Sequence, residues 1–148
     1  MNAWMIVKNT MYLIDTNVIS ELRKEHKANA GVKAFFQQVI EQELPVFISV
    51  ITVGELRRGV EMIRYRGDTE QATILERWLL TIIEQYADNI VAFGELEAQV
   101  WGRLRVPHYE NALDKQIAAT ALTHDLILVT RNVDDFAATG VKLLNPFV

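Results

Sequence analysis

The chain has 148 residues, of which 50% are hydrophobic and 23% are charged, and this length and composition are typical of one globular domain. It contains no cysteine, which excludes disulfides, thiolate nucleophiles, cysteine-ligated zinc and iron–sulfur clusters, and favours a cytoplasmic protein. The formal net charge of -4 gives no overall positive field for a polyanion. No apolar stretch reaches the roughly 18 residues that a membrane span needs, so no membrane partner is expected.

The first ten residues, MNAWMIVKNT, precede a second methionine, Met11, which opens a strand pattern. We therefore expect residues 1–10 to be an extension or an alternative start. Residues 11–148 are expected to form a single domain, because they contain no repeat and no linker.

The first half of the chain alternates apolar strand patterns with helical periodicity. Residues 12–14 predict a strand, followed by a helix at residues 18–22. A helix at about residues 30–41 is expected to bury one face, made of Val32, Phe35, Phe36, Val39 and Ile40. The β-branched and aromatic residues 46–51 predict a second strand, which is followed by a helix to about residue 66.

The second half continues the alternation. Residues 74–86 carry apolar side chains at i, i+3 and i+4, which predicts an amphipathic helix whose stripe, including Trp78, belongs to the core. Strands are expected at 89–93, 126–130 and 141–144, and helices at 95–105, 111–124 and 134–138. In the helix at 111–124, the inward residues are expected to be Ile117, Ala118, Ala121 and Leu122. This order predicts a three-layer α/β/α fold with a mostly parallel central sheet of about four to five strands.

Acidic residues stand at the carboxyl ends of the predicted strands, where an open parallel sheet binds its ligands. Asp15 closes the first strand, Glu55 lies in the first helical turn after the second, and Asp114 opens the helix that leads into the fourth. Asp135 follows the fourth strand. The fold could therefore bring together acids that are far apart in the sequence.

Each acid also has a structural interpretation as part of a helix cap. Thr52 with Glu55 forms a T-x-x-E capping box, Asn111 with Asp114 forms a similar pair, and Asp15 precedes a helix. A cap contributes roughly 1 kcal/mol. A shared pocket instead favours a cation, because carboxylates about 4 Å apart repel by roughly 4 kcal/mol at an effective dielectric near 20.

The cation that fits these residues is Mg²⁺ or Mn²⁺. Carboxylates combined with amide or hydroxyl oxygens from Asn17, Thr130 and Asn132 are the ligands that hard cations prefer. Zinc is not expected, because the three histidines have no paired spacing. The residues expected instead at the surface or in loops are His26, His108 and His124.

Four segments together resemble a known family. YLIDTNVISEL (12–22), ISVITVGELRRGV (48–60), ALDKQIAATAL (112–122) and LILVTRNVDDF (126–136) are similar, in order and spacing, to the motifs of PIN-domain proteins of the VapC and FitB type. These proteins are ribonuclease toxins of bacterial type II toxin–antitoxin modules. The resemblance runs from Met11 nearly to the end of the chain and includes Asn145 and Pro146.

The resemblance implies a role for each residue of the pocket. Asp15 and Asp114 would be direct ligands of Mg²⁺ (or Mn²⁺), and Glu55 would be the third acid. Some relatives have Asp where this chain has Asn132, and others use the acid before the phenylalanine, here Asp135. This chain fits the second pattern. The residues implied to support these acids or to orient water are Thr16, Asn17, Thr130 and Asn132.

The resemblance also implies a reaction and partners. The reaction is hydrolysis of RNA phosphodiester bonds by a water molecule that the metal activates and that Glu55 or Asp135 orients. Basic residues expected to bind the RNA substrate are Lys115, Arg131, Arg57 and Arg58. Implied partners are a small VapB-like antitoxin, operator DNA through that antitoxin only, and a second copy of the chain in a homodimer.

Three alternatives remain open at this point. Because Asn132 replaces an acid, the chain could be a PIN-like binding module that is catalytically weak. A phosphohydrolase that phosphorylates its own Asp15 would need a second aspartate two residues later, where this chain has Asn17. A nuclease acting on DNA would use the same scaffold.

Overall fold

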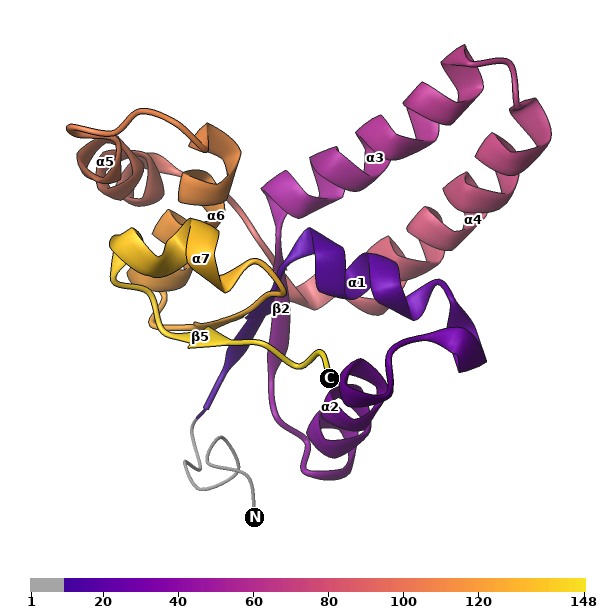
Figure 1. Cartoon of the computed structure of the whole chain (residues 1–148), viewed down its shortest axis with the longest axis horizontal. Helices are drawn as coiled ribbons and strands as arrows, with labels where there is room; N and C mark the ends of the chain where they lie inside the picture. Colours follow the sequence, from indigo (N-terminus) through magenta and orange to yellow (C-terminus); the bar gives the residue numbers. More distant parts are fainter. Residues whose placement is uncertain (1–9) are drawn as a thin grey trace.

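The structure, a computed structural model, describes residues 10–148 and contains one five-stranded sheet (Figure 1). All four strand pairings are parallel, in the spatial order β3–β2–β1–β4–β5. The strands are β1 (Tyr12–Ile14), β2 (Val46–Ser49), β3 (Ile90–Val91), β4 (Ile127–Val129) and β5 (Leu143–Leu144). The expected parallel α/β sheet is confirmed, with shorter strands than the apolar runs predicted.

In the described residues, seven α-helices connect and cover these strands. They are α1 (Thr16–Leu22), α2 (Ala30–Glu41), α3 (Val50–Tyr65), α4 (Thr69–Gln85), α5 (Glu95–Leu104), α6 (Ala112–Thr123) and α7 (Val133–Phe136). Short 3₁₀ turns occur at η2 (Glu25–Lys27), η3 (Ala87–Asn89) and η4 (Ala137–Thr139). Within the described residues, no helix is long and apolar enough to cross a membrane.

The three layers follow from alternation along the central strand. Tyr12 and Ile14 point to one face of the sheet and join a core cluster with α1, α2, α3 and α4. Leu13 points to the other face and joins a second cluster built on Ile117 of α6 and Phe136 of α7. All three residues of β1 are fully buried, as expected for a strand covered on both faces.

The strand order places a topological switch point beside β1. The chain proceeds from β1 outward to β2 and β3, then returns to build β4 and β5 on the other side of β1. The loops that leave the carboxyl ends of β1 and β4 therefore diverge, and a site for ligands forms between them. Asp15 and Thr130 are the first residues after these two strands.

Helices α3 and α4 form an antiparallel hairpin that projects from the body of the molecule (Figure 1). Ion pairs join the two helices on their polar side. The Arg57 guanidinium lies 2.5 Å from a Glu76 carboxylate oxygen, and Arg64 lies 3.2 Å from the other Glu76 oxygen and also pairs with Glu61. Leu75, Leu79 and Ile82 of α4 are buried and Trp78 packs partly buried against them, so the stripe contributes to the core, but Ile74 at its start is 53% exposed rather than inward.

Several sequence expectations about element boundaries and burial are wrong. Helix α3 begins at Val50, so residues 50 and 51 are helical rather than extended, and Ser49 caps the helix by accepting from the Ile51 N–H at 3.0 Å. Ile40, expected on the buried face of α2, is 74% exposed because it lies in the last turn of the helix. Leu122, near the end of α6, is likewise exposed rather than inward.

The expectation that residues 1–10 form an extension concerns mostly residues outside the described part of the chain. Thr10, which is described, is buried two residues before β1. The first described backbone contact of β1 is the Tyr12 N–H donating to the Pro45 carbonyl at 3.1 Å. The expectation that all three histidines lie at the surface is confirmed.

Candidate metal-dependent active site

Asp15 is the most firmly held acid at the carboxyl edge of the sheet. Its side chain is only 4% exposed, and it caps α1 by accepting from the Thr16 N–H at 2.8 Å on Oδ1. On Oδ2 it accepts from the Thr130 hydroxyl at 2.7 Å and from the Asn17 amide at 3.3 Å. Burial raises the pKa of the Asp15 carboxyl, while these three hydrogen bonds lower it. The expected capping role and a role in the site therefore coexist in one side chain.

The Thr130 hydroxyl joins the ends of β1 and β4. It is fully buried, donates to Asp15, and accepts from the Asn132 backbone N–H at 3.1 Å. The side-chain nitrogen Nδ2 of Asn17 lies 3.4 Å from the same hydroxyl, and the side-chain oxygen Oδ1 of Asn17 accepts from the Arg131 backbone N–H at 3.1 Å. These contacts fix the Asp15 carboxylate in one orientation, as the D-T-N resemblance implied for Asn17.

Glu55 is held by the other side chain of that motif. The Thr16 hydroxyl donates to Glu55 Oε1 at 3.0 Å and lies 3.3 Å from the hydroxyl of Thr52. Burial raises the pKa of Glu55, and the charge of Asp15 raises it further. The predicted capping box of Thr52 with Glu55 is wrong, because α3 starts before Thr52 and Ser49 is its cap.

Asp114 and Asp135 complete a set that we call the acid cluster (Asp15, Glu55, Asp114 and Asp135). The pKa of Asp114 is raised to about 6, first by burial and then by the charges of Asp15, Asp135 and Glu55. The predicted cap pair is wrong, since Asn111 adopts a left-handed conformation with φ 56° and makes no capping hydrogen bond through its side chain. Four acids from different parts of the chain thus feel one another's charge at one edge of the sheet.

No basic side chain of the described residues forms an ion pair with the acid cluster. Among residues 10–148, none of the ion pairs includes a member of the cluster. In the same described residues, no three Asp, Glu or His side chains converge tightly enough to form a ready-made metal-ligand group. The cluster is therefore a set of mutually repelling carboxylates whose spacing is wider than that of a closed coordination shell.

The donor set nevertheless fits a hard divalent cation. All four side chains offer carboxylate oxygens, and the acceptor capacity of a carboxylate is about four hydrogen bonds. Asp15 uses three of its acceptor positions, which leaves one on Oδ1 for a cation. Asp114 is half-buried and Asp135 is exposed, so neither of these two side chains is locked in the core.

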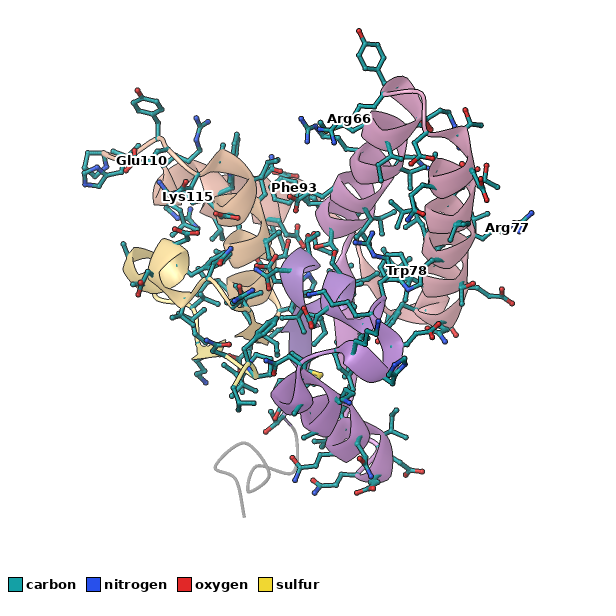
Figure 2. All side chains as sticks on the ribbon, turned by 45° about the vertical axis from the view of Figure 1, so that its right-hand side comes forward. Arg66, Arg77, Trp78, Phe93, Glu110 and Lys115 are labelled. Atoms are coloured by element: carbon teal, nitrogen blue, oxygen red, sulfur yellow. The ribbon has the colours of Figure 1, made fainter. Side chains whose placement is uncertain are left out.

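The four basic residues predicted to bind substrate differ in the contacts that their charged groups make in the folded chain. The Arg57 guanidinium is directed to Glu76 of α4, and the Lys115 ammonium is buried and donates to the His108 carbonyl. Arg131 is exposed and stacks over the ring of Phe147 at 4.9 Å. Arg58 is exposed beside Glu55. Figure 2 labels Lys115 on α6, and Arg66 far from it at the tip of the α3–α4 hairpin.

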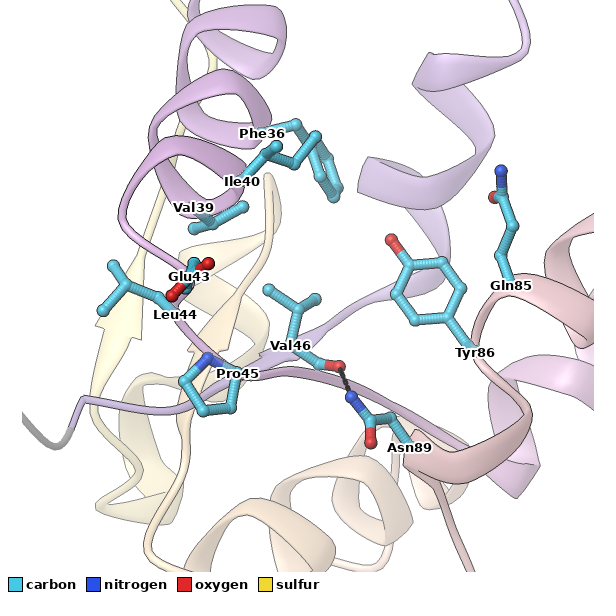
Figure 3. Close-up of a pocket in the computed structure, with 10 residues that line it drawn as sticks. All are labelled: Phe36, Val39, Ile40, Glu43, Leu44, Pro45, Val46, Gln85, Tyr86 and Asn89. Atoms are coloured by element: carbon cyan, nitrogen blue, oxygen red, sulfur yellow. Dashed lines mark hydrogen bonds between the residues drawn. The ribbon is translucent and has the colours of Figure 1, made fainter.

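Two cavities lie away from the centre of the acid cluster. One, of about 330 Å³, lies between the loop before α6 and α7 and is lined by Lys115 and Asp135 among others. Another, of about 380 Å³, lies at the opposite edge of the sheet between the ends of α2 and α4 (Figure 3). There the Asn89 amide donates to the Val46 carbonyl at 2.9 Å, and the walls are mainly apolar. This second cavity is remote from the acids.

Comparison with known proteins agrees with this geometry. The family model described as "PIN domain" matches residues 12–142, which include strands β1 to β4 and the whole acid cluster. The chain belongs to the PIN-domain family. The resemblance inferred from the four sequence motifs is thereby confirmed.

This PIN domain has similar curated and solved relatives. It is 36% identical to Toxin FitB of Neisseria gonorrhoeae (strain ATCC 700825 / FA 1090), over 93% of this chain and 99% of that protein. It is 32% identical to VapC ribonuclease Y4jK of Sinorhizobium fredii (strain NBRC 101917 / NGR234), over 93% and 98%. The structure of FitAcB from Neisseria gonorrhoeae superposes with a TM-score of 0.78 at 33% identity, over 93% of this chain and 98% of that one.

The structure adds one residue to the site that the sequence motifs did not single out for it. Thr52 is fully buried and its hydroxyl lies beside that of Thr16, so it supports the threonine that holds Glu55. The sequence does contain a sign of this role, because Thr52 lies one helical turn before Glu55. That spacing also matches a capping box, which is the role predicted for it from the sequence. The charge of Asp135 raises the pKa values of both Asp15 and Asp114.

Proposed function

We propose that this PIN domain is a Mg²⁺- or Mn²⁺-dependent endoribonuclease and the toxin of a type II toxin–antitoxin module that acts in the cytoplasm. The observation that supports this most directly is the acid cluster, in which burial, and then the charges of Asp15, Asp135 and Glu55, raise the pKa of Asp114 to about 6. A fold that gathers charges in this way compensates the repulsion with a cation. The curated relatives that are named as a toxin and as a ribonuclease support the same conclusion.

The residues of the cluster would divide the work. Asp15, Asp114 and Glu55 would hold the metal, and when bound it would supply a Lewis acid that polarises the phosphate and activates water. Thr130, Asn17 and the Thr16 N–H keep the Asp15 carboxylate oriented. Glu55, positioned by the Thr16 hydroxyl, and the exposed Asp135 are the groups that can orient water or take its proton.

The experiment is cleavage of a labelled single-stranded RNA by the purified chain, free of any partner, at low salt. We expect cleavage with Mg²⁺ or Mn²⁺, none with EDTA, and a loss of at least about 100-fold in Asp15→Asn. Asp134→Asn is the matched control, because Asp134 is an exposed neighbour of Asp135 outside the acid cluster. DNA of the same sequence tests the alternative substrate.

Failure to cleave any RNA with Mn²⁺ would overturn the nuclease and favour the alternative of a PIN-like binding module. Retention of full activity in Asp15→Asn would show instead that another part of the chain performs the reaction. Cleavage of DNA in preference to RNA would replace the substrate and keep the site.

The partner we infer is a small VapB-like antitoxin that binds operator DNA. Similar structures include FitAB bound to the IR36 DNA fragment, at 31% identity and a TM-score of 0.78. An Arg or Lys of such a partner would find unneutralised carboxylates in the acid cluster. Co-expression with a VapB-like antitoxin should yield a complex in which RNA cleavage is suppressed, and light scattering should show a homodimer of the free chain.

A further inference from the structure

A shallow cavity of about 280 Å³ lies beside the acid cluster, between the beginnings of α3 and α6. We call it the α3–α6 slot, and its lining residues are Val50, Ile51, Gly54, Glu55, Arg58 and Leu113. Val50 and Leu113 are apolar side chains that are 41% and 52% exposed. Because Glu55 belongs both to the slot and to the acid cluster, the slot opens directly beside the candidate catalytic groups.

Gly54 keeps this surface open. A Cβ atom at Gly54 would meet no atom within 4 Å, and its φ lies outside the left-handed region, so neither packing nor backbone conformation requires glycine here. Glycine inside a helix costs about 1 kcal/mol relative to alanine. The residue therefore leaves an open stretch of backbone between two apolar side chains.

Arg58 gives the slot a positive end. The other two arginines of α3, Arg57 and Arg64, pair with Glu61 and Glu76 on the hairpin. Arg58 is exposed and takes part in none of the ion pairs among residues 10–148. It lies one helical turn after Glu55, so its charge is available to an anion that approaches the acid cluster along α3.

We propose that the α3–α6 slot binds one unstacked base of a single-stranded RNA, and that Arg58 contacts the phosphate next to it. The proposal rests on the proposed ribonuclease function and adds where the substrate strand lies. Protein pockets hold an extruded base between aromatic or apolar side chains, and contact with the face of a base is tolerant of sequence because every base has such a face. A volume just below the range of about 300–1,000 Å³ for pockets of drug-sized ligands suits one heterocycle.

Two glycine substitutions on the same helix test the slot. Gly54→Leu places a side chain in the cavity, whereas Gly59→Leu makes the same chemical change outside it, where a Cβ also meets no atom within 4 Å. Both raise helix propensity, so neither is expected to unfold α3. Binding of a fluorescein-labelled single-stranded RNA of twelve nucleotides is measured by anisotropy in an Asp15→Asn background, and cleavage is measured in the parent background.

We expect Gly54→Leu to weaken binding by at least about fivefold and to reduce cleavage similarly, while Gly59→Leu stays within about twofold of the parent. Arg58→Gln should weaken binding and reduce the slope of log affinity against log salt by about one. Equal binding and cleavage by Gly54→Leu and Gly59→Leu would overturn the slot and leave the ribonuclease intact.

Two further outcomes also decide against the slot. A change in molecular mass by light scattering in Gly54→Leu, without a change in RNA binding, would assign this surface to contact between copies of the chain. If the parent chain neither binds nor cleaves RNA, the proposed function fails first and the slot fails with it.

Discussion

Replacing Thr130 by valine removes one hydroxyl and keeps the shape of the side chain. In the folded chain this hydroxyl is fully buried and donates at 2.7 Å to the Asp15 carboxylate, while it accepts from the Asn132 N–H. A hydrogen bond to a charged group contributes about 1.5–3 kcal/mol, because the buried charge has no water to replace a lost partner. We expect Thr130→Val to lower the free energy of unfolding by about 2 kcal/mol at pH 7.5, which corresponds to about 4–8 °C in Tm.

The chain supplies a matched control in Thr120. This threonine is also fully buried, but its hydroxyl donates to a neutral acceptor, the Gln116 backbone carbonyl at 3.1 Å in α6. Such a bond within a helix contributes little, so Thr120→Val should change stability by less than about 1 kcal/mol. The assay is urea unfolding of the two variants and the parent chain without divalent ions.

The difference between the two variants should also depend on pH. The hydrogen bond from Thr130 lowers the pKa of Asp15, so Thr130→Val raises that pKa further. At low pH Asp15 is protonated, and the missing hydrogen bond then no longer leaves a buried charge without a partner. The penalty of Thr130→Val should therefore shrink between pH 7.5 and pH 4. Equal effects of the two substitutions at pH 7.5, or a difference that does not change with pH, would refute this account of Asp15.

Three further predictions concern the charges. The pKa of Asp114 in the folded chain is about 6, above its ordinary value of 3.8, so between these values the folded chain binds more protons than the unfolded chain. The contribution of Asp114 to stability should therefore fall as pH rises from about 4 to about 6. Urea unfolding across this range without divalent ions checks the prediction, and a stability of the parent chain that does not change with pH would contradict it. Asp114→Asn removes repulsion, so it should raise Tm at pH 7.5 without metal and abolish the rise that Mn²⁺ gives the parent chain, as thermal denaturation with and without Mn²⁺ would show. Arg57→Gln should cost under about 1 kcal/mol and leave RNA cleavage unchanged, because its guanidinium serves a partly exposed ion pair with Glu76; loss of cleavage would return Arg57 to the substrate site.

Much of the fold was predictable because local signals agree with tertiary packing. Helix α2 was expected at residues 30–41 and is found there, since Asn29 caps it by accepting from the Gly31 N–H at 2.9 Å. The boundary between β2 and α3 was missed. Residues 50 and 51 are valine and isoleucine, whose β-branched side chains favour strands, but the cap at Ser49 starts the helix at Val50.

The candidate site was predictable to the level of which acids meet. A parallel sheet brings the carboxyl ends of its strands to one edge, so the placement of Asp15, Glu55 and Asp114 follows from topology. The partners of the long basic side chains were not predictable, because they lie on other elements whose position is set by the tertiary fold. Arg57 pairs with α4, and Lys115 reaches the loop that precedes α6, neither of which local sequence could indicate.

The acid cluster as a cation site is tested most directly by calorimetric titration of Mn²⁺ into the chain without RNA at pH 7.5. We predict saturable binding in the parent chain and in Asp134→Asn, and its loss in Asp15→Asn and Asp114→Asn. Absence of binding in the parent, or binding that survives both substitutions, would contradict a metal site built from these carboxylates.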